Sequence, residues 1–211
     1  MKKYRVSKIK NNSNIISDAY WKEAVILNEF SYPWQHKISN QTRFRALYDD
    51  TYLYLRYDVE DDMVQIYTET GKKNDVVHSD RVEIFFRKNN QLEPYYCLEI
   101  DPNGLVLDYA ASYYRKFDFE WTWPKNHLFV TGTINPKGYR VDVTISLKSM
   151  QDLGLLHNNI IEAGIFRADC IELPKDCGGE ASIKWISWVN PKSKAPDFHI
   201  PSSFGILELI A

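Results

Sequence analysis

The stretch that decides the fold is Ser79-Asp80-Arg81-Val82-Glu83-Ile84-Phe85-Phe86. Its even positions from Val82 to Phe86 are apolar and share one face, whereas Arg81 and Glu83 lie on the other. This period of two predicts a half-buried β-strand. A charged pair on the rigid face of a sheet indicates a polar ligand site. A surface pair that only aids solubility is the alternative, because such pairs contribute little to stability.

Turn signals on either side of this strand predict a series of antiparallel hairpins. They are Asp49-Asp50, Asp101-Pro102-Asn103-Gly104 and Asn135-Pro136-Lys137-Gly138. The flanking strands are expected at 44–48, 52–59, 95–100, 105–109, 127–134 and 139–147, with further strands at 160–168, 182–189 and 206–210. Short helices are expected near 17–24 and 148–153. The pattern predicts an all-β fold, an antiparallel, jelly-roll-like β-sandwich of about ten strands in a single domain spanning 1–211.

Composition narrows the classes of partner. The chain has 211 residues, 44% hydrophobic content and a formal net charge of −2, so it has no basic footprint for nucleic acid or an anionic membrane. Aromatic residues reach 14%, enough to fill a core and leave some for stacking on a ligand. No stretch approaches the ~20 apolar residues of a membrane span. Neither nucleic acid nor a membrane is expected as a partner.

The N-terminus and the cysteines say little about the compartment. Residues 11–14 are polar where a signal peptide has its apolar region, so the chain as written is cytoplasmic at face value. Removal of a precursor segment would instead allow secretion or a periplasmic location. The three cysteines, Cys97, Cys170 and Cys177, form no CxxC pair, and the most plausible single disulfide joins Cys170 to Cys177.

Several motifs in order resemble family 9 carbohydrate-binding modules over nearly the whole chain. They are Trp21 in the early helix, Leu47 to Leu55, Asp80 to Phe86, and Pro201-Ser202-Ser203-Phe204-Gly205. The segments 187–191 and 196–199 further resemble family-9-like proteins of gut Bacteroidetes. The resemblance implies a bacterial β-sandwich that binds glycans without catalysis, between two aromatic side chains, in support of polysaccharide degradation. It also implies structural calcium in some members and a glycoside hydrolase as a partner.

The resemblance assigns some site residues and departs from the family at others. Glu83 matches the acidic residue that binds sugar hydroxyls, and Phe198 matches one clamp aromatic. The other clamp position falls near Val77 or His78, where no large aromatic stands. The position of the family's sugar-binding Arg falls near Glu99, which reverses the charge.

Other ligand candidates come from the residues themselves. Arg167, on the strand expected at 160–168, would supply the missing guanidinium. Trp121 and Trp123 share one face and form either a stacking platform or part of the core. Trp185 and Trp188 must face opposite ways in a strand, and Trp188 is expected nearer the ligand because it borders the long loop 190–203. His199 is expected there too, beside Phe198.

An acidic cluster at a strand end offers the hard oxygen ligands that calcium prefers: Asp58, Glu60, Asp61 and Asp62. A solvated acidic loop is the alternative. The histidines show no spacing typical of a transition-metal site.

Two other functions remain open. A glycoside hydrolase would need two carboxylates flanking the scissile bond, and Glu83 with Glu99 is one such pair. A haem-binding sandwich would need an axial pair, for which Met63 or Met150 with a histidine are the candidates. No GxSxG motif and no Gly-rich phosphate loop supports any other enzyme.

Overall fold

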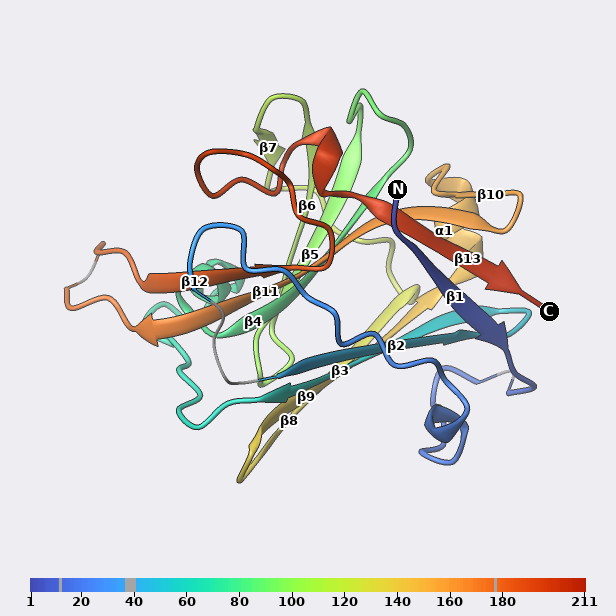
Figure 1. Ribbon diagram of the computed structural model, residues 1–211, viewed down its shortest axis with the longest axis horizontal. Helices are drawn as coiled ribbons and strands as arrows, with labels where there is room; N and C mark the ends of the chain where they lie inside the picture. Colours follow the sequence, from blue (N-terminus) through green and yellow to red (C-terminus); the bar gives the residue numbers. More distant parts are fainter. Residues whose placement is uncertain (12, 37–40, 177) are drawn as a thin grey trace.

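The computed structural model describes residues 1–11, 13–36, 41–176 and 178–211. In these ranges thirteen strands join into one curled sheet, whose main path runs β7-β6-β5-β4-β11-β13-β1-β2-β3-β9-β8, with β10 and β12 paired to β11 (Figure 1). The strands are β1 (Lys3–Lys8), β2 (Thr42–Tyr48), β3 (Tyr52–Glu60), β4 (Arg81–Arg87), β5 (Tyr95–Ile100), β6 (Val106–Ser112), β7 (Lys116–Asp118), β8 (Leu128–Asn135), β9 (Gly138–Ser146), β10 (Leu156–His157), β11 (Ile160–Glu172), β12 (Ser182–Ser187) and β13 (Gly205–Ile210). The helical elements are η1 (Tyr20–Lys22), η2 (Lys73–His78), α1 (Leu147–Asp152) and η3 (Pro201–Ser203).

The sheet is mixed, which corrects the expectation of a strictly antiparallel fold. β1 runs parallel to β13 and to β2, and Figure 1 shows blue β1 beside red β13. A parallel pair needs a long connection, and residues 9–41 provide one between β1 and β2. The sequence pattern did not predict β1, so it could not predict these parallel pairs.

The main core lies between the two halves of the curled sheet, as in a sandwich. One half contributes side chains such as Ile84 and Leu98 from β4 and β5, and the other contributes Leu55 and Val143 from β3 and β9. All four are completely or almost completely buried. The predicted alternation of the strand 79–86 is confirmed, since its even apolar positions point into this core.

The half of the sheet around β4 is also covered on its outer face. Phe85 and Phe166, from β4 and β11, lie in a second apolar cluster with Phe198 and Phe204 of the C-terminal segment. Every residue of β4 is therefore buried. The prediction of a half-buried strand was wrong, because the segment between β12 and β13 folds over the face expected to meet solvent.

The predicted hairpins are confirmed. β2–β3, β5–β6 and β8–β9 are antiparallel pairs joined at the three predicted turns. The helix expected near 17–24 is only the single turn η1, whereas α1 is present one residue earlier than expected. No helix in the described ranges is long and apolar enough to cross a bilayer.

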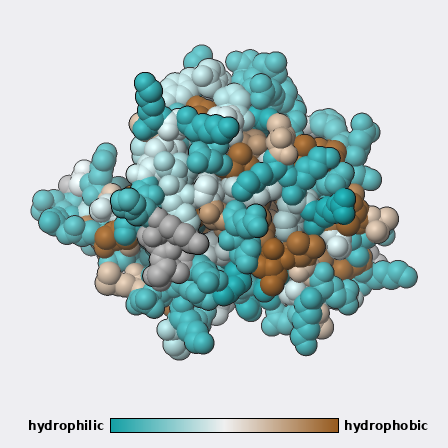
Figure 2. Space-filling view, in the orientation of Figure 1, coloured by the Kyte–Doolittle hydropathy of each residue, from teal (hydrophilic) through white to brown (hydrophobic). Residues whose placement is uncertain are grey.

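The cysteines and the surface add two facts. Cys97 and Cys170 are buried free thiols, and Cys177, expected to pair with Cys170, lies outside the described residues. The face seen in Figure 2 is mainly hydrophilic, with hydrophobic residues in small separate patches. That face therefore offers no broad apolar surface.

Gly205, the first residue of β13, lies against the indole ring of Trp188. A Cβ at Gly205 would lie 2.6 Å from Cζ3 of Trp188, which is 2% exposed and held in the main core. Gly205→Ala should therefore lower the free energy of unfolding by ~1–3 kcal/mol through overpacking, measured by urea denaturation. The cost should shrink in a Trp188→Phe background, since the overlapping ring atoms are then gone. An equal cost in both backgrounds would contradict this account.

Candidate functional site

A hollow of about 230 Å³ opens on the outer face of β4, β5 and β6. We call it the outer hollow. Its lining comes from segments far apart in the sequence: Trp34, Val77, Arg81, Glu83, Glu99, Leu107, Tyr109, Arg115, Phe117, Phe119, Trp185, Pro196, Asp197, Phe198 and His199. It thus has a floor on the sheet and walls from loops and from β7 and β12.

Four polar side chains on three adjacent strands form the floor. Glu83 on β4 lies directly opposite Glu99 on β5, and both carboxylates accept a hydrogen bond from Nε of Arg81, at 2.9 and 2.8 Å. The hydroxyl of Tyr109 on β6 donates to the other oxygen of Glu99 at 2.8 Å. Arg81 also donates from Nη1 to the carbonyl of Val77 at 2.9 Å. The floor is therefore held rigidly by hydrogen bonds across the sheet.

The floor has more acidic groups than basic ones. Two carboxylates face one guanidinium, and Arg81, Glu83 and Glu99 are 4%, 2% and 6% exposed. Burial, and secondarily the charge of Glu99, raises the pKa of Glu83 to about 8, although Arg81 acts in the opposite direction. Because Glu83 and Glu99 share the one guanidinium of Arg81, ionising both carboxyl groups at once costs free energy.

Two atoms of the floor remain available to a ligand. Among the described residues, neither Nη2 of Arg81 nor the second carboxylate oxygen of Glu83 has a hydrogen-bond partner, and both residues line the outer hollow. A hydrogen-bond donor and an acceptor thus lie side by side at its base.

Aromatic side chains form the walls. Trp185 from β12 covers the guanidinium of Arg81, with Cζ 5.2 Å from the ring centre. Trp34 lies beside Phe198, with ring centres 5.4 Å apart. Phe117 and Phe119, at β7, form the opposite group, and Phe119 is 43% exposed. Trp34, Trp185 and Phe117 are only half-buried, so their rings are accessible from the hollow.

The rim is fixed by contacts between the β6–β7 region and the C-terminal segment. Asp197 accepts hydrogen bonds from Arg115 at 3.2 Å and from the hydroxyl of Tyr114 at 2.7 Å. Nδ1 of His199 lies 3.1 Å from the hydroxyl of Tyr95. Burial, with a smaller effect of Arg115, lowers the pKa of His199 to about 3, so this ring is neutral.

The structure brings together part of the set expected from sequence. Glu83, Arg81, Glu99, Phe198 and His199 all line the outer hollow. Phe198 is 5% exposed and stacks on Phe166 with ring centres 4.0 Å apart, so it offers little free surface to a ligand.

Five expected ligand residues lie elsewhere: Arg167, Trp188, Trp121, Trp123 and His78. Arg167 pairs in register with Val82 and so faces the inner side of the sheet, opposite to Glu83. Trp188 is buried in the main core, where Trp123 also lies and against which Trp121 packs. His78 ends η2 with its ring against Tyr67. None of these five residues lines the outer hollow.

The sequence pattern missed most of the walls. Trp185 pairs with Ala168, which pairs on its other side with Arg81, so the three share one face of the sheet. The sequence pattern predicted that Trp185 and Trp188 face opposite ways, and Trp188 was expected nearer the ligand. In the structure Trp185 is the one that lines the hollow. No sequence pattern indicated the other residues of the hollow, because only the fold brings their segments together. They are Trp34, Tyr109, Arg115, Phe117 and Phe119.

The methionines do not support a haem site. Met63 is 61% exposed, whereas Met150 is fully buried in the main core. Neither lines the outer hollow.

A comparison with protein families identifies the chain. Residues 14–211 match the model described as carbohydrate family 9 binding domain-like. The chain belongs to this family. None of the curated proteins matches it.

Solved structures show the same fold at low sequence identity. A candidate carbohydrate-binding protein from Bacteroides uniformis ATCC 8492 is 15% identical, with a TM-score of 0.74 and coverage of 99% of both chains. A family 9 carbohydrate-binding module from Caldicellulosiruptor kristjanssonii in complex with cellotriose is 18% identical, with a TM-score of 0.63, covering 99% of this chain and 93% of that one. The structure of a family 9 module from that organism with glucose is 19% identical, with a TM-score of 0.57, covering 99% and 96%.

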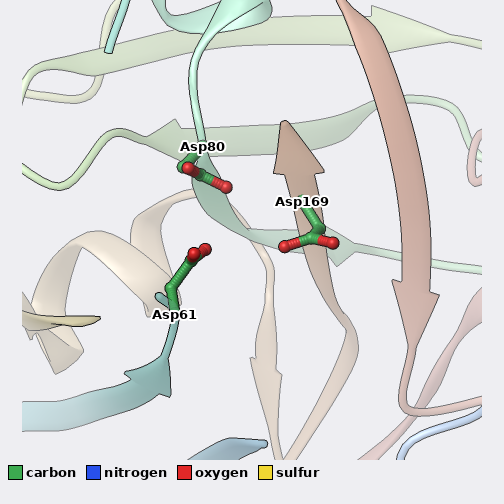
Figure 3. Close-up of side chains that lie close together, drawn as sticks. All are labelled: Asp61, Asp80 and Asp169. Carbon is green, nitrogen blue, oxygen red and sulfur yellow. The ribbon is translucent and has the colours of Figure 1, made fainter. Parts of the chain in front are cut away.

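The acidic cluster expected to bind calcium does not form as predicted. Asp58 pairs with Arg45 and Arg140, and Glu60 pairs with Arg43. Asp62 is exposed. The fourth member, Asp61, instead lies with Asp80 and Asp169, and one carboxylate oxygen from each lies within 4.8 Å of the others (Figure 3).

This second group of three aspartates fits a calcium ion poorly. Nη2 of Arg167 lies 2.6 Å from both Asp61 and Asp169 and supplies positive charge between them. Backbone N–H groups occupy the other oxygen of Asp61 and both oxygens of Asp80. Calcium needs six or more oxygen ligands, and most of these oxygens are already engaged. Instead, the guanidinium of Arg167 supplies positive charge to this group of aspartates.

We therefore expect the stability of the fold to require Arg167 but not calcium. Arg167→Met should lower the free energy of unfolding by ~3–5 kcal/mol, because it leaves buried carboxylates without a counter-charge. Arg43→Met, which removes the exposed pair with Glu60, should cost less than ~1 kcal/mol. Chemical denaturation measures both, and chelation with EDTA should leave the Tm of the unmodified protein unchanged. A fall in Tm on chelation would contradict this assignment.

The floor predicts a dependence of stability on pH. Glu83 has a folded pKa raised above its ordinary value of 4.5 to about 8. A raised pKa gives a contribution that is fully present below the unfolded pKa and is lost as pH rises through the folded pKa. The free energy of unfolding of wild type minus that of Glu83→Gln should thus decrease between about pH 4.5 and 8. Urea denaturation across this range checks it, and a constant or rising difference would contradict it.

Proposed function

We propose that this chain binds carbohydrate without catalysis in the outer hollow. The observation that carries the proposal is the floor, where an open guanidinium nitrogen of Arg81 and an open oxygen of Glu83 lie beneath accessible aromatic rings. Family membership and the cellotriose and glucose complexes of the related modules support it.

Sugar chemistry matches each part of the hollow. Hydroxyl groups both donate and accept hydrogen bonds, so a neighbouring donor and acceptor suit a pair of adjacent hydroxyls. The C–H faces of a sugar ring are apolar and pack on aromatic rings. Trp185 and Trp34 on one side, with Phe119 on the other, offer such surfaces. These rings replace the clamp expected at Phe198 and near Val77.

The size of the hollow favours a small ligand. Its volume of about 230 Å³ lies below the ~300–1,000 Å³ typical of pockets for drug-sized molecules. A monosaccharide or the end of a glycan chain fits this size better than an internal stretch. Within polysaccharide degradation, such a module would hold a glycan end near a glycoside hydrolase.

A glycoside hydrolase is the weaker alternative. Glu83 and Glu99 are the required pair of carboxylates, but both already accept a hydrogen bond from the same nitrogen of Arg81. Glu83 keeps one open oxygen, but both oxygens of Glu99 are engaged, by Arg81 and by Tyr109, so only one carboxyl of the required pair is available. Incubation with the glycans that bind should release no reducing sugar, and release that depends on Glu83 would establish catalysis instead.

Replacement of the Glu83 carboxyl group by an amide should weaken sugar binding. A glycan array identifies the ligand, and titration calorimetry then compares wild type with Glu83→Gln. The loss of one polar contact to the ligand should cost ~1–3 kcal/mol, roughly tenfold to a hundredfold in affinity. Glu162→Gln is the matched control, because Glu162 pairs with Arg87 on the same half of the sheet and does not line the hollow. Unchanged affinity in a folded Glu83→Gln would refute the site.

The tryptophans should separate in the same assay. Trp34→Ala and Trp185→Ala should each reduce affinity by about twofold to tenfold, since each removes an aromatic face whose stacking contributes ~0.5–1.5 kcal/mol. Trp121→Ala is the control, a half-buried tryptophan outside the hollow. If Trp121→Ala reduced affinity as much as the other two, stacking in this hollow would not be the cause.

A further inference from the structure

The charges of the outer hollow do not balance. Its lining holds three carboxylates, Glu83, Glu99 and Asp197, and two guanidinium groups, Arg81 and Arg115. Arg115 and Asp197 pair with each other at the rim. The floor is thus left with Glu83 and Glu99 against Arg81 alone.

The geometry of the floor leaves one of its two carboxyl groups without a counter-charge of its own. Glu83 and Glu99 are directly opposite on neighbouring strands, an arrangement that destabilises a sheet when both are ionised. The open oxygen of Glu83 and the shared guanidinium face the hollow, not bulk water. The other titratable groups that face Glu83 supply no positive charge: Tyr109 donates only a hydroxyl proton to Glu99, and His199 is neutral. With its pKa raised to about 8, Glu83 therefore holds a proton near neutral pH, which a bound cation can replace.

The walls favour a cation for a separate reason. Trp34, Trp185, Phe117 and Phe119 surround the hollow, and the faces of aromatic rings attract cations. Trp185 already covers one cation, the guanidinium of Arg81. An acidic floor under aromatic walls therefore has the chemistry that recognises an ammonium group on an otherwise apolar and hydroxylated ligand.

We propose that the outer hollow selects an amino sugar, a hexosamine with a free protonated amine, over the matching neutral hexose. The ammonium group lies against Glu83, whose proton passes to the solvent, and supplies the missing positive charge of the floor, while the sugar ring packs on the tryptophans. This inference rests on the proposed function and names its class of ligand. An N-acetylated amino sugar has no charge and gains nothing from the floor.

Three matched pairs of sugars test the inference on the full chain near neutral pH. Glucosamine, galactosamine and mannosamine are each compared with the corresponding hexose by titration calorimetry, and N-acetylglucosamine serves as the uncharged derivative. At least one hexosamine should bind about tenfold or more tightly than its hexose, because a charge-assisted hydrogen bond is stronger than a neutral one. N-acetylglucosamine should bind no more tightly than glucose.

A variant separates charge from shape. Glu99→Gln keeps the outline of the floor but leaves Glu83 with Arg81 as its own counter-charge, so the ratio of hexosamine to hexose affinity should fall toward one. Glu162→Gln should leave the ratio unchanged, since Glu162 lies outside the hollow. An unchanged ratio in Glu99→Gln would overturn the role given to the floor.

The outcomes distinguish this inference from the function on which it rests. If neutral hexoses bind as tightly as hexosamines, and Glu83→Gln weakens both, the preference is overturned and carbohydrate binding stands. If no sugar binds, on the array or in the matched pairs, both are overturned. The preference is supported only if the amine raises affinity and Glu99→Gln removes that gain.

Discussion

Burial of charge on both faces of neighbouring strands is the constraint on which this structure depends. The sheet around β4 and β11 is covered by the main core on its inner side and by the C-terminal segment on its outer side. Arg81 on the outer face and Arg167 on the inner face both lie where water cannot solvate them. Each is neutralised by two carboxylates.

The two charged groups have different consequences because their atoms are engaged differently. Around Arg167, backbone N–H groups take up the remaining carboxylate oxygens of Asp61 and Asp80. The one nitrogen of Arg167 without a partner among the described residues, Nε, is fully buried, so no ligand reaches this group and it serves stability. Around Arg81, one nitrogen and one oxygen of Glu83 are left open to a hollow with aromatic walls. An apolar floor of similar volume would often be more stable than a buried ion pair. Retention of open charges at this place is therefore best explained by a ligand.

The parts of the fold that the sequence predicts are those governed by local chemistry. Asp101 to Gly104 determines a turn through the conformations of proline and glycine, and the flanking strands are present as expected. β1 was missed, since its parallel partners are far along the chain and leave no turn signal beside it. Of the site, Arg81, Glu83 and Glu99 were found because one strand pattern and one family motif contain them. The walls were not, because the side of the sheet that a tryptophan faces depends on register, which only the assembled sheet defines.

The departures from the family pattern are best understood as compensated within the same hollow. No large aromatic stands at Val77 or His78, and Phe198 is packed against Phe166 with little exposed surface. Trp34, Trp185 and Phe119 reach the same space from three other segments, and their rings stay accessible. Glu99, where the family pattern has an arginine, reverses a charge, but Arg81 lies between it and Glu83 and restores a guanidinium to the floor. A site that had lost its function would have no need of a buried, imperfectly neutralised carboxylate pair, because replacing it would cost nothing in binding and would remove a strain on folding. The open atoms of that pair, beneath accessible aromatic rings, are the ones that the proposed ligand would use.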